Sequence, residues 1–247
     1  MKARVLCVVV GILLVSMVSV SSAQDFDDVA PDESEQVLQL FSALSTCGAF
    51  HTAKLHSIAG LDVGVQLVNL IIPGDYKDWP DGPFSDKGVI SLPYLHANIG
   101  LPLKFEAFGR FFHYPMGTEP SREGVTFIGF GLKRGILQAP LLPKVAVMAT
   151  YHSFFVPDVF NFGTVSNIAG RIIASQDFLI FNVYGGIGYD YTQFKLEDEV
   201  VELNENIDGV HGNVGIQINP FPLLHVYADY HFADFAGFTI GAGLSFR

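Results

Sequence analysis

The chain has 247 residues and carries 14 Lys and Arg against 25 Asp and Glu, a formal net charge of −11. This acidic balance excludes nucleic acid as a partner, because binding to phosphates needs a basic face. Only 16% of the residues are charged and 49% are hydrophobic, whereas ordinary soluble domains carry about 25% charged residues. The composition therefore argues against an ordinary soluble domain.

The first residues have the features of an export signal. Lys2 and Arg4 precede an apolar run from Val5 to Val20, and Ser21-Ser22-Ala23 offers small residues at the positions that a signal peptidase reads. We expect residues 1–23 to be a signal peptide for Sec export, cleaved near Ala23. Cleavage leaves Cys47 as the single cysteine, for which we expect a half-buried, inert thiol and no intramolecular disulfide.

Residues 24–58 form an acidic N-terminal segment that is predicted to contain a short helix. Apolar residues recur there at helical spacing, namely Val37, Leu40, Phe41 and Leu44. This spacing predicts an amphipathic helix over residues 35–45. Two placements of the helix fit the pattern: a plug inside a lumen, or a cap at its periplasmic mouth.

From residue 59 to residue 247 the dominant period of the hydrophobic pattern is two, the period of a β-strand. The last segment alternates most regularly, with Phe238, Ile240, Ala242, Leu244 and Phe246 on one face and Thr239, Gly241, Gly243 and Ser245 on the other. After residue 23 no apolar run approaches the roughly 20 residues of a transmembrane helix. The pattern predicts an all-β fold, a transmembrane antiparallel up-and-down β-barrel.

Ten strands are predicted, with eight or twelve as the alternatives. Ten satisfies the even number that bacterial single-chain barrels have. The predicted ranges are 59–71, 89–100, 103–115, 124–136, 144–156, 161–175, 178–194, 207–219, 223–232 and 236–247. Long loops alternate with short turns over most of the chain, which predicts that both chain ends lie in the periplasm.

Aromatic residues gather near the ends of the predicted strands, where barrels carry girdles at the two membrane interfaces. The residues predicted to form these girdles are Tyr94, Phe111, Phe112, Tyr114, Phe154, Phe155, Phe160, Phe162, Tyr189, Tyr191, Tyr230 and Phe232.

With the apolar faces toward lipid, the opposite faces of the strands line the lumen. The lumen-lining candidates are Asp62, Gln66, His96, Lys104, Glu106, Arg110, Arg171, Asp190, His211, Gln217, His225, Asp229 and His231. Asn98, Lys133, His152, Asn182 and Asn213 share these faces. In a narrow barrel such side chains pair across the interior, and a ligand passage lined by the same residues is the alternative.

The sharpest enzymatic pattern is Asp229-Tyr230-His231, because residues two apart on a strand share a face and the carboxylate could orient the imidazole as a general base. It is similar to the Asp-x-His element of omptin proteases, which are also ten-stranded. Their second acidic pair has no counterpart here, so no catalytic residues are predicted. Histidines such as His51, His56 and His113 lack metal-ligand spacing, and we expect neither a metal nor a cofactor.

The passage Phe50-His51-Thr52-Ala53-Lys54-Leu55-His56, followed by Gly60-Leu61-Asp62-Val63, resembles uncharacterised outer-membrane barrels of the DUF6588 family. In that family a short helix leads into an N-T-A-K-x-H…G-F-D passage, and His51 and Leu61 stand where the pattern has Asn and Phe. The resemblance is sharpest over residues 35–65. It implies an outer-membrane barrel and no assigned activity.

The expected function is a narrow pore or transporter for small or apolar solutes, or a surface-structural role, in the bacterial outer membrane. Expected partners are outer-membrane lipid and lipopolysaccharide, a small solute, and the outer-membrane assembly machinery. Phe246, near the end of the last strand, resembles the C-terminal signal that this machinery reads. Two other classes stay open: an outer-membrane barrel hydrolase that uses the Asp-x-His element, and a secreted soluble β-protein that binds a ligand.

Overall fold

The computed structural model describes residues 31–73, 88–115, 124–155, 164–197 and 202–246. The predicted signal peptide lies outside these residues. The elements are α2 (Pro31–Thr46), β1 (Leu61–Ile71), β2 (Val89–Leu101), the 3₁₀ turn η2 (Pro102–Lys104), β3 (Phe105–Pro115), β4 (Gly124–Leu137), β5 (Lys144–Phe155), β6 (Thr164–Asp177), β7 (Phe181–Glu197), β8 (Glu202–Ile218), β9 (Leu224–Phe232) and β10 (Gly237–Phe246).

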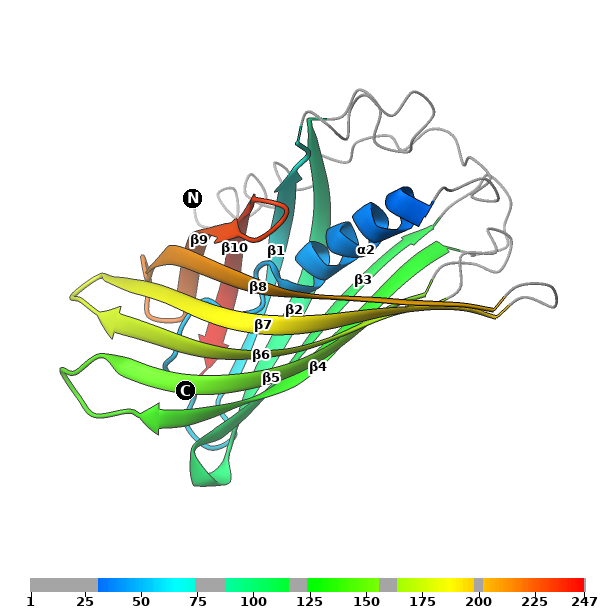
Figure 1. Ribbon diagram of the computed structural model, residues 1–247. Coiled ribbons are helices and arrows are strands. Elements are labelled where there is room, and N and C mark those ends of the chain that lie inside the picture. The colour runs from blue at the N-terminus through cyan, green and yellow to red at the C-terminus, as the bar shows by residue number, and fades with distance from the viewer. Residues whose placement is uncertain (1–30, 74–87, 116–123, 156–163, 198–201, 247) are drawn as a thin grey trace.

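The ten strands form a closed antiparallel barrel in which each strand pairs with its neighbour in sequence and β1 pairs with β10 (Figure 1). The register of the closing pair sets Val65 opposite Ala242. Closure gives the backbone groups of the first and last strands hydrogen-bond partners. In an open sheet these groups would be unpaired in hydrocarbon. The predicted number and direction of the strands are confirmed. The largest boundary difference is the start of β8, because β7 and β8 stay paired as far as Glu197 and Glu202.

The outer surface of the barrel is apolar. Aliphatic and aromatic side chains that alternate along the strands are exposed there, among them Leu95, Phe130, Leu132, Ile168, Ile172, Ile187, Val210, Val214, Ile240 and Leu244. Ile168, for example, is 58% exposed. An outward apolar band is what a barrel needs in order to lie in hydrocarbon, whereas a soluble barrel needs a polar outer face. The strands therefore span a membrane.

Among the residues that the structure describes, no helix is both long enough and apolar enough to cross a membrane.

The connections between strands differ at the two ends of the barrel. One end, called here the short-turn end, carries the turns at 102–104, 138–143, 178–180 and 219–223. The opposite end carries the β1–β2, β3–β4, β5–β6, β7–β8 and β9–β10 connections and is called the loop end. Lys104 was predicted to line the lumen, and this prediction is wrong. It lies exposed in the turn at the short-turn end, at φ 62°, because the strand begins only at Phe105.

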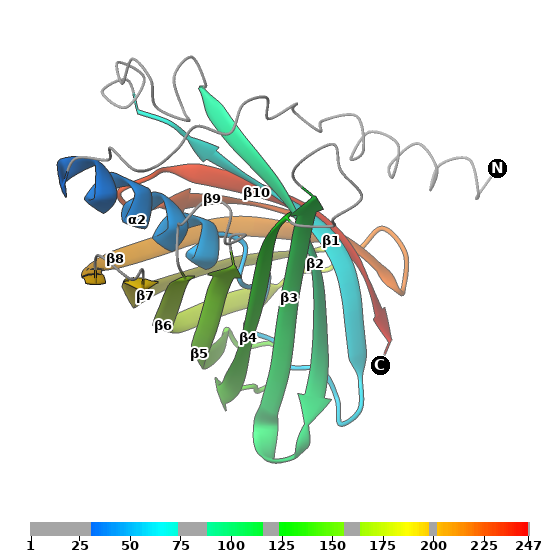
Figure 2. The ribbon, with the colours of Figure 1, turned by 90° about the vertical axis from the view of Figure 1, so that its right-hand side faces the viewer.

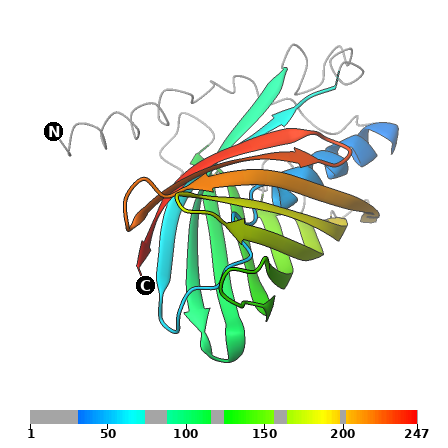
Figure 3. The same cartoon turned by 90° about the vertical axis from the view of Figure 1, so that its left-hand side faces the viewer.

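The lumen is filled by the chain's own N-terminal segment. Residues 38–56, called here the plug, run from the loop end toward the short-turn end (Figures 2 and 3). The apolar face of α2 packs near the loop end against inward residues such as Val68 and Phe127. Further along, Phe50 and Ala53 pack against Tyr184 and Ile173. Of the two placements that the sequence left open, the described side chains of the helix occupy the lumen.

The plug also changes the role of several aromatic residues. Tyr94, Phe112 and Phe154 were predicted to form membrane girdles, but they are buried inside the barrel. Phe154 packs edge-on against Phe41 of the helix, with 4.7 Å between ring centroids. Large aromatic rings of the wall face inward because they pack against the apolar helix in the lumen. The sequence of a strand alone does not reveal that such a helix is present. Phe160 and Phe162 lie outside the described residues.

Candidate functional site

The barrel wall holds the end of the helix through its backbone. The last carbonyl groups of an α-helix have no partner within the helix, and side chains of the wall supply them here. Tyr94 donates from its hydroxyl to the Leu44 oxygen (3.4 Å), and Arg171 donates from Nη1 to the Thr46 oxygen (3.1 Å). Arg110 donates to two further carbonyls of this segment. Cationic groups are also favoured at this end of the helix by its dipole.

Arg110 makes two of these contacts. It donates from Nη1 to the Cys47 oxygen at 2.6 Å and from Nη2 to the Ser45 oxygen. Its guanidinium carbon lies 5.3 Å from the ring centroids of both Tyr94 and Phe127. The helix ends at this point because the chain turns at Gly48, whose φ of 62° favours glycine.

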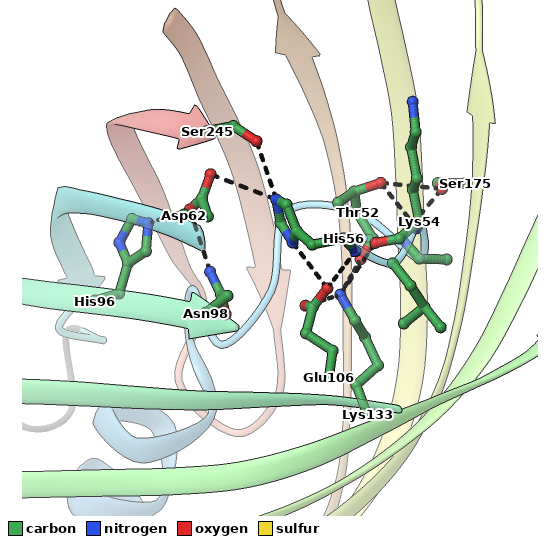
Figure 4. A network of polar contacts seen from close by, with 12 residues as sticks. Thr52, Lys54, His56, Asp62, His96, Asn98, Glu106, Lys133, Ser175 and Ser245 are labelled. Atoms are coloured by element: carbon green, nitrogen blue, oxygen red, sulfur yellow. Dashed lines mark hydrogen bonds and ion pairs between the residues drawn. The ribbon is translucent and has the colours of Figure 1, made fainter. Parts of the chain in front are cut away.

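A buried ion pair holds residues 52–56 of the plug, near the short-turn end. Lys133 of β4 lies 2.6 Å from Glu106 of β3, nitrogen to carboxylate oxygen, and its ammonium also donates to the Thr52 and Lys54 carbonyls at 3.3 Å each (Figure 4). Glu106 in turn accepts a hydrogen bond from the backbone N–H of His56 at 2.9 Å. His56 Nδ1 also lies 2.8 Å from Glu106. Both charges of the pair are nearly inaccessible to solvent, so each depends on such partners for its stability.

A cluster of histidines lies beside this pair, around Asp62 of β1. The Asp62 carboxylate lies 3.3 Å from His96 Nε2, 3.5 Å from His225 Nδ1 and 3.8 Å from His56 Nε2. Figure 4 shows the carboxylate between the His96 and His56 rings. His51 of the plug stacks on His225, with 4.8 Å between ring centroids. One potential ligand nitrogen from each of His51, His96 and His225 lies within 4.8 Å of the other two, and all three side chains are buried.

This cluster borders a cavity of about 260 Å³. His51, Asp62 and His225 line its inner part, and residues of the turns at the short-turn end, such as Leu179 and Pro222, line its outer part. The cavity therefore leads from the short-turn end to the histidines. Its lining is largely polar, which suits a hydrated or charged ligand better than an apolar one.

A second carboxylate cluster lies in the lumen nearer the loop end. Asp190 of β7 faces His211 Nδ1 at 3.0 Å and accepts a hydrogen bond from Asn167 at 2.9 Å. Ser42 of the helix also donates to Asp190. The plug therefore contacts the wall through its side chains as well as its backbone.

Asp229 and His231, the pair that the sequence offered as an enzymatic pattern, also lie next to the plug. Asp229 and His231 both point inward and are buried. Asp229 accepts a hydrogen bond from the Tyr184 hydroxyl at 3.0 Å, and His231 Nε2 lies 3.4 Å from Thr46 Oγ1. The two side chains are thus covered by the plug and by the wall, and the cavity described above does not reach them. This geometry favours a packing role for the pair.

The remaining candidates lie as follows. Gln66 is buried and accepts a hydrogen bond from the Tyr227 hydroxyl at 2.8 Å. Gln217 is half-buried and lines the outer part of the cavity. Every candidate other than Lys104 faces the interior or its mouth. The inward histidines His51 and His56 were not among the candidates, because they precede the strands. The passage Phe50–His56 that carries the family resemblance was the available signal.

Burial also sets the state of the single cysteine of the plug. Cys47 is completely buried, where the prediction was a half-buried thiol. Burial raises the pKa of the Cys47 thiol well above its usual range, because the thiolate would lose its hydration.

The chain is similar to several solved structures, at low sequence identity. Ail of Yersinia pestis in complex with sucrose octasulfate is 12% identical, over 77% of this chain and 100% of that chain, with a TM-score of 0.34. The N-terminal β-barrel domain of Pseudomonas aeruginosa OprF is 6% identical, over 77% and 100%, with a TM-score of 0.35. The translocator domain of the autotransporter NalP from Neisseria meningitidis is 12% identical, over 87% and 95%, with a TM-score of 0.40. No conclusion about activity follows from likeness at this level.

No curated protein matches the chain. A family model does match, over residues 74–246, and its description is a family of unknown function, DUF6588. The match begins after the passage at residues 35–65 on which the resemblance rested, and it covers the barrel from the β1–β2 connection to β10. The chain therefore belongs to the DUF6588 family.

Proposed function

We propose that this protein is a barrel of the bacterial outer membrane and that its lumen is a passage for small solutes, gated by the plug. The apolar outer surface and the export signal support the location, with outer-membrane lipid and lipopolysaccharide as the molecules around the barrel. Assembly machinery that reads the C-terminal strand would insert it. Density-gradient separation of membranes and heat-modifiable gel migration test this location, and recovery of the protein in the soluble fraction would contradict it.

One observation carries the gating proposal: the wall grips the backbone of the plug. Successive carbonyls from Leu44 to Cys47 accept hydrogen bonds from Tyr94, Arg110 and Arg171. These bonds can break and re-form without any covalent change. Beneath the plug the wall carries charged and amide side chains, which would line a wet passage once the plug moved. With the plug in place, open diffusion is blocked.

A reversible lock between plug and wall tests the gate in the full chain. Thr52 Oγ1 of the plug lies 3.3 Å from Ser175 Oγ of β6. Cysteines at both positions, with Cys47→Ser in the background, could close a disulfide whose S–S length is about 2.05 Å. In planar bilayers we expect openings from the reduced double variant under applied voltage and none from the oxidised form.

The matched control is the Thr52→Cys single variant, which cannot form the lock and should respond to neither oxidant nor reductant. Equal conductance of the oxidised and reduced double variant, with the disulfide confirmed by mass, would contradict a gating role for the plug. A barrel that stays closed in both forms would favour the surface-structural role.

A further inference from the structure

The three clustered histidines come from three distant parts of the chain. His51 belongs to the plug, His96 to β2 and His225 to β9. All are buried, with potential ligand nitrogens within 4.8 Å of one another. Buried imidazoles lose hydration and need partners in return, yet His96 has only the Asp62 carboxylate, 3.3 Å from its Nε2, and its Nδ1 is buried without a hydrogen bond. Packing alone does not account for this placement.

Two glycines make room for the rings beside the wall. Gly64 of β1 lies opposite His96 in the strand register, and Gly243 of β10 lies opposite His225. A Cβ atom at either glycine would lie 2.6 Å from the Cε1 atom of the facing ring. The lack of a side chain at both positions therefore leaves the room that the two imidazoles occupy beside the wall.

Asp62 supplies the negative charge of the cluster. Its carboxylate faces one nitrogen of His96 and one of His225, at 3.3 and 3.5 Å, and its Oδ2 atom is buried without a hydrogen bond. Carboxylates in this position orient metal-bound histidines, because a ring held at one nitrogen offers the other to an ion. The nearby Glu106 is already balanced by Lys133 at 2.6 Å, which leaves Asp62 to offset a cation.

We propose that His51, His96 and His225 form a binding site for a divalent transition-metal ion such as Zn²⁺, with Asp62 as the positioning carboxylate and the fourth coordination position open to the cavity. Imidazole ligands select ions of this class over Mg²⁺ and Ca²⁺. In a tetrahedral zinc site the ligand nitrogens lie about 3.3 Å apart, given zinc–nitrogen bonds of about 2.0–2.1 Å. The separations between the nitrogens, which are up to 4.8 Å in this structure, would shorten by up to about 1.5 Å to reach that geometry. The cavity of about 260 Å³ gives the ion a path from the short-turn end.

Spacing along the sequence could not predict such a site, because the ligands meet only when the barrel closes around the plug. The site does not rest on the proposed gating, since it needs the plug only in its described position.

Metal binding by the purified, detergent-solubilised full chain tests the proposal. After treatment with a chelator, the protein is titrated with Zn²⁺ and the bound metal per chain is measured. We expect one tightly bound Zn²⁺ that millimolar Mg²⁺ or Ca²⁺ does not displace. X-ray absorption of the zinc-loaded protein should show three imidazole ligands, and this readout needs no variant.

The variants should separate the ligands from their surroundings. His96→Ala should abolish the tight site, and Asp62→Asn should weaken it about 10- to 100-fold, as loss of such carboxylates does elsewhere. Gly243→Ala keeps all three histidines but displaces the His225 ring, so it should also weaken binding. His113→Ala is the matched control, because that histidine is exposed and faces Thr126. Heat-modifiable migration shows that each variant has folded.

Two results would overturn the proposal. One is a wild-type chain, folded and free of metal, that takes up no Zn²⁺, Co²⁺, Ni²⁺ or Cu²⁺ in a one-to-one ratio. The other is tight binding that survives in folded His96→Ala or that the absorption spectrum assigns to other ligands.

Discussion

Arg110 of β3 donates from Nη1 to the carbonyl oxygen of Cys47 at 2.6 Å, so the barrel wall recognises the plug by its backbone. A guanidinium carries five donors in a fixed plane and stays charged at any physiological pH. Tyr94 and Phe127 lie against that plane. The contact depends little on the side chains of the plug, and it makes Arg110 the residue whose loss should free the plug most directly.

Arg110→Met should loosen the plug without opening the barrel wall. The change removes the two hydrogen bonds to the plug, each worth about 2 kcal/mol from a charged donor, and leaves the Ser45 and Cys47 carbonyls without this partner. It also removes the 3.0 Å contact between Arg110 and His152 Nε2 of the wall. We expect more frequent openings in planar bilayers and faster proteolysis within residues 38–56. Arg134→Met is the control, because Arg134 is exposed on the outer face against Phe105. Equal opening rates in the two variants would contradict the role of Arg110.

Cys47 should report whether the plug is in place. The thiol is fully buried, and burial raises its pKa, so the reactive thiolate is scarce in the folded protein. We expect no labelling by a maleimide in the folded wild type and full labelling after heat denaturation. Arg110→Met should label at an intermediate rate. Rapid labelling of the folded wild type would show that the lower end of the helix lies outside the lumen.

The Glu106–Lys133 pair should matter more when broken than when replaced. Removal of one partner leaves a buried charge uncompensated, which costs about 3–5 kcal/mol. Lys133→Met should therefore lower the free energy of unfolding by an amount of that order, measured by denaturant in lipid vesicles. The double variant Glu106→Gln with Lys133→Met should recover a large part of the loss. If the double variant is as unstable as the sum of the two single variants, the pair does not act as a unit.

The sequence predicts the wall of this barrel well, because alternation has a period that exposure to lipid enforces. In β9, His225, Tyr227, Asp229 and His231 all face inward as the pattern requires. The sequence predicts the lumen less well. Tyr94 and Phe112 looked like girdle residues, since nothing on their own strands shows that a helix from elsewhere occupies the interior.

The histidine site is the clearest case of this difference. His96 and His225 were predicted to face the lumen, but His51 comes from a segment without strand periodicity. The three meet through barrel closure, the register of β1 with β2 and the path of the plug, and each of these is a long-range property. Lys104 shows a different error. The alternating pattern was extended beyond the start of the strand into a turn, where it no longer predicts which way a side chain faces.

The path of the plug predicts where the segment ahead of the helix emerges. Ser42 contacts Asp190 high in the lumen, whereas Ala53 donates to Ser175 Oγ at 3.1 Å near the short-turn end, so the chain descends from helix to strand. Pro31 therefore lies toward the loop end, opposite to the end of β10, whereas the sequence predicted both chain ends on the periplasmic side. We expect the loop end to face the cell exterior, as the long loops of outer-membrane barrels do. An epitope inserted between Ala23 and Pro31 should bind antibody on intact cells. The matched control is an epitope after Arg247, which should require permeabilised cells because β10 ends at the short-turn end. The reverse pattern of accessibility would contradict either the orientation of the barrel or the direction of the plug, and the Cys47 labelling described above would tell which of the two is wrong.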